Sequence, residues 1–257
     1  MIALLASVAC GDEIDAALSG GADIIDLKDP SMGALGAWKI ESIREAVGKL
    51  KGRRPVSATI GDLPLQPEIV ATAVRATAET GVDIVKIGFF DGSTQACIAA
   101  LEPIAERVHL VAVLFADRSP DFDLLPALAK AGFFGVMLDT ADKSKGTLRD
   151  HVDEPILAQF AALARTQQLR FGLAGSLAMT DIPPLLSLSP DFLGFRRALC
   201  GAAGRTGKLD SAAVANVKRA IETQIPDART ATATAGAQIA ASFRTAASTG
   251  TRSAKST

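Results

Sequence analysis

The chain has 257 residues and a formal net charge of −1, which argues against a general nucleic-acid binder, because such a protein needs a basic surface. Hydrophobic residues make up 48% of it, enough for a large core, but no apolar run reaches the roughly 18 residues of a membrane-spanning helix. The three cysteines show no metal or disulfide spacing, and two histidines are too few for a His-rich metal site. We therefore expect a cytoplasmic protein that binds no metal, membrane or nucleic acid.

Eight short apolar runs recur along the chain, and their starts lie roughly 20 to 35 residues apart, the length of a strand, a helix and two loops. The first run lacks the basic n-region of a signal peptide, and Gly11-Asp12-Glu13 follows it at once, so we interpret it as a strand. The predicted strands are 2–8, 23–28, 56–61, 83–88, 110–116, 135–140, 171–176 and 192–199.

Amphipathic stretches with helical character follow the runs. Three of them end at a glycine, Gly21, Gly81 or Gly132, after which the chain enters the next strand. Repeated strand–helix units predict a parallel sheet, and eight of them close a (β/α)8 barrel. A doubly wound sheet is the alternative, but it usually carries a glycine fingerprint after its first strand, which is missing here. The predicted helices are 11–18, 39–51, 67–80, 94–107, 123–131, 153–168, 180–188 and 208–223.

The composition changes near residue 225. From there the chain is mostly Ala, Thr, Ser, Gly and Arg, with Phe243 as its only aromatic residue. Such a segment cannot bury enough apolar surface to order itself. We predict a single α/β domain, a (β/α)8 TIM barrel over residues 1–224, and a flexible tail without chemistry over 225–257.

Charged residues interrupt the second, fourth and sixth predicted strands near their C-terminal ends, where a barrel of this kind has its active site. Asp26 and Lys28 are two residues apart and so point to the same face of a strand. Lys86 and Asp139 lie on strands of the same parity, and side chains from alternate strands share layers in the barrel. A structural ion pair explains any one of these residues, but the four together favour an active site.

Two lysines in one buried site indicate imine chemistry. Two close ammonium groups disfavour each other's charged form, so one of them loses its proton more easily. A neutral lysine is a nucleophile that forms a Schiff base with a carbonyl. Neighbouring carboxylates can then move the protons that imine chemistry requires.

The seventh and eighth predicted strands carry candidates for phosphate binding, since the loops after these strands commonly form a phosphate site. Gly175 and Ser176 end the seventh strand, Gly194 leaves room for a close backbone approach, and the Arg196 guanidinium offers a fork for phosphate oxygens. Ser176 is not expected to act as a nucleophile, because neither histidine is placed to serve it. We therefore predict a small-molecule phosphosugar substrate.

Several phrases of the sequence are specific: Gly-Ala-Asp-Ile-Ile-Asp-Leu-Lys-Asp-Pro at 21–30 with Gly-Ala-Leu-Gly at 33–36, Val-Ser-Ala-Thr-Ile-Gly-Asp at 56–62, Val-Lys-Ile-Gly at 85–88, Met-Leu-Asp-Thr-Ala at 137–141 and Leu-Ala-Gly-Ser at 173–176. They resemble the (5-formylfuran-3-yl)methyl phosphate synthase family, also called 4-(hydroxymethyl)-2-furaldehyde-phosphate synthase, over about residues 2–222. The pattern differs at residue 197, where an arginine stands in place of the expected glycine.

The resemblance implies a lyase of methanofuran biosynthesis that condenses two molecules of glyceraldehyde 3-phosphate into a furan aldehyde phosphate, with loss of phosphate and water. It also implies that no cofactor is needed and that a lysine forms a Schiff base. By motif that lysine corresponds to Lys28, and Lys86, Asp26, Asp139 and Lys143 fall where the family's other active-site groups fall.

Two alternatives stay open. One is another class I, aldolase-like phosphosugar barrel. The other is a non-catalytic barrel that binds a phosphate ligand or serves as a scaffold, although such a protein has no need of so many inward charges. We also expect a homo-oligomer.

Overall fold

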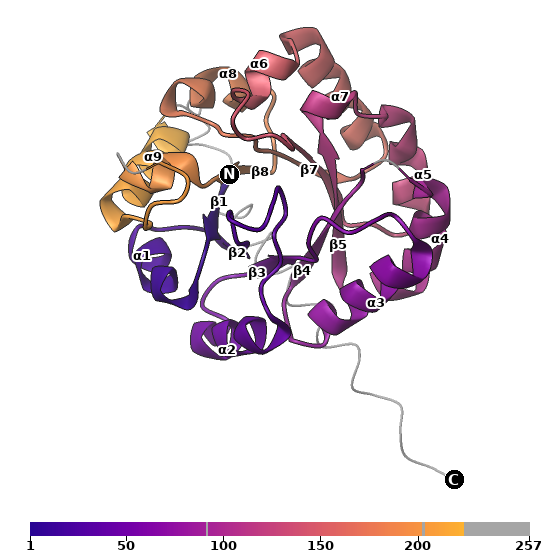
Figure 1. Cartoon of the computed structure of the whole chain (residues 1–257). Helices are drawn as coiled ribbons and strands as arrows, with labels where there is room; N and C mark the ends of the chain where they lie inside the picture. The colour runs from indigo at the N-terminus through magenta and orange to yellow at the C-terminus, as the bar shows by residue number, and fades with distance from the viewer. Residues whose placement is uncertain (91, 202–203, 224–257) are drawn as a thin grey trace.

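The structure is a computed structural model that describes residues 1–90, 92–201 and 204–223, so the predicted tail over 225–257 lies outside the described residues. Eight parallel strands form a closed barrel in chain order, and β1 pairs with β8 (Figure 1). The predicted (β/α)8 barrel is therefore confirmed. The strands are β1 Ala3–Val8, β2 Ile24–Leu27, β3 Val56–Thr59, β4 Ile84–Gly88, β5 His109–Phe115, β6 Gly135–Asp139, β7 Arg170–Leu173 and β8 Phe192–Phe195.

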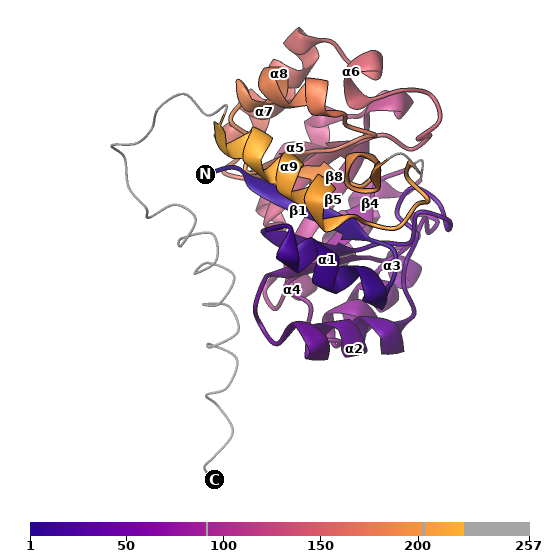
Figure 2. The ribbon, with the colours of Figure 1, turned by 90° about the vertical axis from the view of Figure 1, so that its left-hand side faces the viewer.

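Helices surround the barrel, and the side view shows α9 beside α1, where the ring of helices closes (Figure 2). The two helices approach closely at Gly20, where a Cβ would lie 2.4 Å from the Cβ of Val214. Among the described helices, none has the length and apolar character to cross a membrane. The helices are α1 Ile14–Ser19, α2 Ile40–Leu50, α3 Pro67–Ala78, α4 Thr94–Ala105, α5 Leu125–Lys130, α6 Leu148–His151, α7 Glu154–Thr166, α8 Ile182–Leu186 and α9 Ser211–Thr223.

The glycines predicted to end helices do so through left-handed backbone conformations. Gly21, Gly81 and Gly132 have φ angles of +86°, +88° and +78°, which glycine adopts at little cost. At the first of them the N–H of Ala22 donates to the carbonyl of Ala17 at 3.0 Å. This bond satisfies a carbonyl at the helix end and directs the chain into β2.

Apolar side chains form two layers, one inside the barrel and one between the sheet and the helices. The inner layer includes Leu5, Ile84, Val111, Met137 and Phe192. The outer layer joins the other faces of the strands to the buried faces of the helices. Since successive side chains of a strand alternate between faces, a polar residue in the inner register is directed toward the barrel axis.

Strands β7 and β8 end earlier than the sequence predicted, at Leu173 and Phe195 rather than at 176 and 199. Gly175 and Ser176 have φ angles of +112° and +50°, and Arg196 has φ −136° and ψ −57°, so none of them continues a strand. These predicted site residues therefore lie on the turns that leave the barrel.

The loop after β2 folds inward over part of the barrel mouth. Leu35 is fully buried there and joins the inner apolar layer with Ala34. Both oxygens of the Asp62 carboxylate hold the loop by accepting the N–H groups of Ala34 and Leu35, each at 2.8 Å. Thr59 donates to the carbonyl of Gly36 at 3.1 Å. The loop thus closes the mouth near β3 and β4.

Candidate functional site

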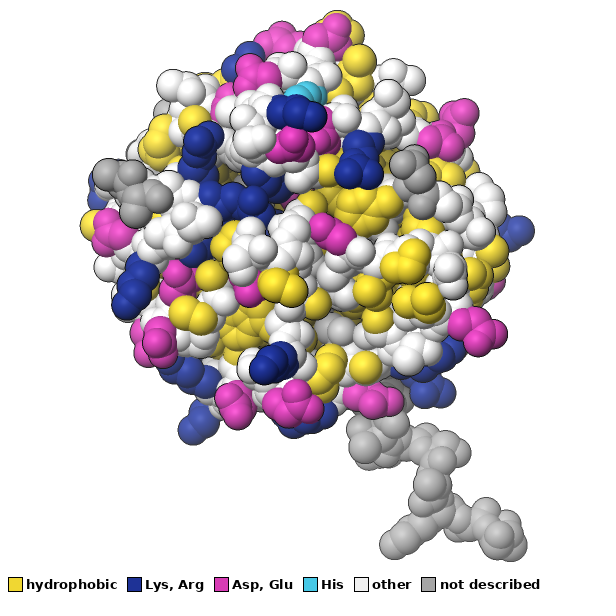
Figure 3. Space-filling model, viewed as in Figure 1, with side chains coloured by type: hydrophobic (Ala, Val, Ile, Leu, Met, Phe, Trp, Pro, Cys, Tyr) yellow, Lys and Arg dark blue, Asp and Glu magenta, His cyan; other side chains and the backbone are white. Residues whose placement is uncertain are grey.

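A cavity opens at the C-terminal end of the barrel, beside the inward-folded loop. Its empty volume is about 480 Å³, which includes space open to solvent. Seen from this end, Lys and Arg side chains gather in a recess near the centre of the face (Figure 3). Every site residue predicted from the sequence lines the cavity except Asp26, which is fully buried behind it. The lining residues predicted from the sequence are Lys28, Lys86, Asp139, Lys143, Gly175, Ser176, Gly194 and Arg196.

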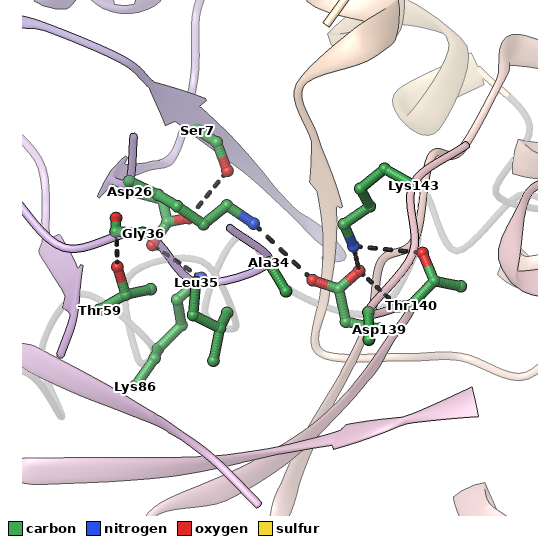
Figure 4. Close-up of polar contacts among 12 residues, drawn as sticks. Ser7, Asp26, Ala34, Leu35, Gly36, Thr59, Lys86, Asp139, Thr140 and Lys143 are labelled. Atoms are coloured by element: carbon green, nitrogen blue, oxygen red, sulfur yellow. Dashed lines mark hydrogen bonds and ion pairs between the residues drawn. The ribbon is translucent and has the colours of Figure 1, made fainter. Parts of the chain in front are cut away.

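Asp26 lies at the centre of a hydrogen-bonded row that crosses three strands. Strand register places Ser7 beside Asp26 and Asp26 beside Ser57. Both hydroxyls donate to the carboxylate, at 2.8 and 2.7 Å. The ammonium of Lys86 lies 2.8 Å from the Oδ1 atom of Asp26, and Figure 4 shows Ser7 and Lys86 with this carboxylate. The two serines were not predicted as site residues. Their positions one strand away from Asp26 are the only sequence signal for them.

The Asp26–Lys86 pair is buried away from water, and the charge of each group shifts the pKa of the other. Burial alone would raise the pKa of Asp26, but the charges of Lys86 and Lys28 hold it below its ordinary value. Burial lowers the pKa of Lys86 against the attraction of Asp26, and the charge of Lys28 lowers it further. Lys86 therefore releases its proton more readily than a lysine in water.

Asp139, at the end of β6, is shared by two lysines. Lys143 donates to its Oδ1 atom, and the ammonium of Lys28 lies 3.7 Å from Oδ2 (Figure 4 shows Lys143 with Asp139 and Thr140). Burial alone would raise the pKa of Asp139, but the charges of Lys143 and Lys28 hold it well below its usual range. Burial lowers the pKa of Lys143 to about 8, even though Asp139 opposes this shift. Lys143 can thus gain and lose a proton near neutral pH.

Lys28 is the least restrained of the three lysines. Its ammonium is beyond hydrogen-bond distance of Asp139, and its side chain makes no hydrogen bond within the described part of the chain. Lys86 and Lys143 are both hydrogen-bonded to carboxylates. The Lys28 ammonium can therefore turn toward a ligand without breaking a hydrogen bond to the protein.

Arg196 lines the cavity, but all five of its N–H groups bind protein acceptors. Nη1 and Nη2 meet the two oxygens of Glu13, at 2.5 and 3.0 Å. Nη1 also donates to the carbonyl of Ser7, Nη2 to that of Gly207 and Nε to that of Arg205. The sequence predicted that the guanidinium group of Arg196 would bind phosphate, whereas in the structure it binds the carboxylate of Glu13. Glu13 lies in the helix predicted over 11–18, and nothing in the sequence relates it to Arg196, so the pair was missed.

Two further arginines at the cavity have no carboxylate partner among the described residues. Arg197 lines the cavity, and its side chain makes no hydrogen bond or ion pair with a described residue. Arg205 lines it as well and donates to the carbonyl of Gly33, across the mouth, at 2.9 Å. Burial lowers the pKa of Arg205, while the charge of Asp139 opposes the shift. The cavity therefore carries excess positive charge, as a site for phosphate esters should.

The small residues predicted to bind phosphate have structural contacts of their own. Ser176 donates to the carbonyl of Lys143 at 3.2 Å and so supports the loop that carries this lysine. A Cβ on Gly194 would lie 2.8 Å from Cε of Met137 and 3.1 Å from Cβ of Ala174. Gly194 is therefore required by packing at the floor of the cavity.

No group of three His, Cys, Asp or Glu side chains able to hold a metal ion occurs within residues 1–90, 92–201 and 204–223. Asp139 is the one described carboxylate that lines the cavity, and it already faces two ammonium groups. A metal cation would meet repulsion there, so the described site suits an anionic ligand.

Solved structures of other barrels resemble this one in fold. The 3-hexulose-6-phosphate synthase from Salmonella typhimurium gives a TM-score of 0.62 at 15% identity and covers 87% of this chain and 100% of its own. The 3-keto-L-gulonate-6-phosphate decarboxylase from Vibrio cholerae gives 0.63 at 14% identity, with 88% and 99% covered. At these identities the likeness shows the fold alone.

Sequence comparison is more specific. A relative from Methylorubrum extorquens is 44% identical over 218 residues, which cover 85% of this chain and 91% of the relative. Several further relatives are named (5-formylfuran-3-yl)methyl phosphate synthase. The one from Methanosarcina acetivorans is 37% identical, with 79% of this chain and 92% of the relative covered. The one from Methanocaldococcus jannaschii is 35% identical, with 84% and 97% covered. The family model described as 4-HFC-P synthase matches residues 4–218, and the chain belongs to this family of (5-formylfuran-3-yl)methyl phosphate synthases.

Proposed function

We propose that the chain condenses two molecules of glyceraldehyde 3-phosphate into (5-formylfuran-3-yl)methyl phosphate, with loss of phosphate and water, through a Schiff base on Lys28. The product is the one in the names of the relatives from Methanosarcina acetivorans and Methanocaldococcus jannaschii. One observation carries the proposal: three lysines and two aspartates from the ends of β2, β4 and β6 and the loop after β6 gather at a cavity, where two arginines also have no carboxylate partner among the described residues.

Lys28 suits the role of the imine-forming lysine. Its ammonium lines the cavity and is free of hydrogen bonds to described residues, whereas Lys86 lies deeper and is held by Asp26. Once deprotonated, the amine adds to the substrate carbonyl carbon, and the resulting carbinolamine loses water to give the imine. This step needs one group to remove a proton from nitrogen and one to protonate the leaving hydroxyl.

Lys143 and Asp139 are placed to move these protons. The pKa of Lys143, lowered by burial to about 8, lets this group act as acid and as base near neutral pH. Asp139 lies between Lys143 and Lys28 and stabilises whichever of them is protonated. Lys86 supplies positive charge beneath Lys28 and is itself held by Asp26.

Arg205 and Arg197 are the groups that we propose for the substrate phosphates. Both line the cavity and neither pairs with a described carboxylate, and guanidinium groups bind phosphate oxygens through paired hydrogen bonds. Gly175 and Ser176, on the turn after β7, border the same space. Arg196 contributes by holding the segment that carries Arg205. The homo-oligomer and the cytoplasmic location stay predictions.

The decisive experiment combines a product assay with chemical trapping. The purified chain should convert glyceraldehyde 3-phosphate into a compound with the ultraviolet absorbance and mass of the furan aldehyde phosphate. Sodium borohydride added during turnover should reduce the imine to a stable secondary amine on the peptide that contains Lys28. Lys28→Arg should abolish both results, because arginine keeps the charge but forms no imine. The matched control is Lys49→Arg, a surface lysine paired with Asp15, which should behave like the wild type.

The same experiment separates the alternatives. An adduct on Lys28 with a product other than the furan would identify another aldolase-like phosphosugar barrel. An adduct on Lys86 or Lys143 with Lys28 unmodified would reverse the assignment within the site. Furan formation without an adduct on any lysine would refute the Schiff base.

A further inference from the structure

Glu13 is a buried acid whose carboxylate has several specific hydrogen-bond partners. Its side chain is buried, and its two oxygens accept from both terminal nitrogens of Arg196. They also accept the backbone N–H of Ala9 at 2.7 Å and that of Leu209 at 3.1 Å. Burial alone would raise the pKa of Glu13, but the hydrogen bond with Arg196 and its other partners lower it overall. Glu13 is therefore an anion that joins the turn after β1 to the segment 204–209.

Arg196 extends this connection toward the cavity. Besides Glu13, it binds the carbonyls of Arg205 and Gly207, at 2.9 and 2.6 Å. The residue whose carbonyl it holds, Arg205, sends its own side chain across the barrel mouth to the carbonyl of Gly33. A buried carboxylate 183 positions away in the sequence from Arg196 thus fixes the backbone at the base of a cavity-lining arginine.

We propose that Glu13 is a positioning residue: through Arg196 it holds segment 204–209 so that the Arg205 guanidinium lies over the catalytic lysines and binds a substrate phosphate. The inference deepens the proposed function and rests on it for the identity of the phosphate ester. Glu13 does not line the cavity, so its effect on the substrate must pass through Arg196 and the segment.

The alternative is that Glu13 only stabilises the fold, and this alternative predicts a different result. If Glu13 only strengthened the fold, Glu13→Gln would lower the melting temperature without a selective change in phosphate binding. If it positions Arg205, the same substitution should raise KM and the dissociation constant for inorganic phosphate together. It should leave kcat nearly unchanged, because the lysines and Asp139 keep their places.

The test is a double-mutant cycle with Glu13→Gln and Arg205→Ala in the full-length chain. Each single variant should weaken binding of inorganic phosphate, measured by titration calorimetry, by about tenfold, which corresponds to one charge-assisted contact. In the Arg205→Ala background, Glu13→Gln should have little further effect, because the group that it positions is already absent. Asp15→Asn removes an exposed carboxylate of helix α1 and should leave phosphate binding unchanged.

Two outcomes would overturn the proposal. Effects that add fully in the double variant would show that Glu13 acts independently of Arg205. A lower melting temperature for Glu13→Gln with unchanged phosphate affinity would leave it a structural role only. The proposed function is tested by a different measurement, because it is wrong if the wild type forms no furan product. The double-mutant cycle measures phosphate binding without turnover and so tests the role of Glu13 on its own.

Discussion

Lys28 and Lys143 approach the two oxygens of one carboxylate, that of Asp139. Lys143 donates to Oδ1, while the ammonium of Lys28 lies 3.7 Å from Oδ2. One negative charge thus faces two ammonium groups in a buried site, and the charge of Lys28 disfavours the protonated form of Lys143. The pKa of Lys143, about 8, reflects burial first and the charge of Lys28 as a further lowering cause, with Asp139 opposing both.

This arrangement predicts the pH dependence of activity. If neutral Lys143 removes the proton from the substrate or from the Lys28 nitrogen, kcat/KM should rise with pH up to about 8 and then level. In Lys143→Met this rise should disappear, and the activity should fall roughly 10²–10⁴-fold, the usual contribution of a general acid–base group. The measurement is a pH–rate profile.

Lys145→Met is the matched control, because Lys145 is exposed on the same loop and pairs with the exposed Asp142. Its profile should match that of the wild type. If Lys143→Met kept the rise near pH 8, another group would be responsible and the assignment of Lys143 would be wrong.

Asp26→Asn should weaken the fold strongly. The substitution leaves the buried Lys86 ammonium without its counter-charge, and removing one partner of a buried ion pair costs about 3–5 kcal/mol of unfolding free energy. Urea unfolding at neutral pH measures this loss. A change below about 1 kcal/mol would show that Lys86 sheds its proton at little cost.

A compensating pair of changes should separate stability from chemistry. Replacing both partners with apolar residues, Asp26→Leu with Lys86→Met, removes both buried charges and should recover much of the lost stability. The double variant should nevertheless remain far less active, because Lys86 no longer supplies charge beneath Lys28. Recovery of stability together with full activity would reduce the pair to a structural role.

The sequence predicted the barrel and the inward side chains on β2, β4 and β6 because both follow from periodic patterns. Strand parity alone directs Asp26 and Lys86 toward the axis. Contacts made by loops have no such period: nothing in the sequence relates Glu13 to Arg196, since the approach depends on how the barrel closes between β1 and β8. For this reason the guanidinium of Arg196 was expected to bind phosphate, and Arg205 was not identified.

Asp62→Ala should loosen the loop after β2 over the barrel mouth. The loop would lose the acceptor of two backbone N–H groups, those of Ala34 and Leu35, at a cost of about 1–3 kcal/mol each where they stay buried and unpaired. Hydrogen exchange at residues 29–37 should accelerate, and KM should rise, because the carbonyl of Gly33 is also the partner of Arg205. Asp121→Ala is a control, since Asp121 accepts a backbone N–H in an exposed turn. Unchanged exchange at 29–37 would show that the other contacts of the loop, the burial of Leu35 and the hydrogen bond from Thr59 to Gly36, are enough to retain it.

Acid should destabilise the chain partly through Glu13. Its pKa is lowered in the folded state, because the contacts with Arg196, Ala9 and Leu209 outweigh the effect of burial. The carboxylate of Glu13 therefore binds a proton less readily in the folded state than in the unfolded chain, where the pKa of a glutamate is about 4.3. The resulting stabilisation is present above that pH and is lost as the pH falls through the lower, folded-state pKa.

Glu13→Gln should remove this part of the pH dependence. Its unfolding free energy, measured by urea titration from neutral pH down to about pH 3, should start lower than that of the wild type and decline less steeply below about pH 4.3. Asp26 and Asp139, whose pKa values are also lowered, should still give the variant some acid sensitivity. Because the Glu13–Arg196 pair is buried, the difference between the two proteins should persist in about 1 M salt, which screens surface pairs such as Asp15–Lys49. Parallel curves for the two proteins throughout the titration would show that Glu13 has the same proton affinity folded and unfolded.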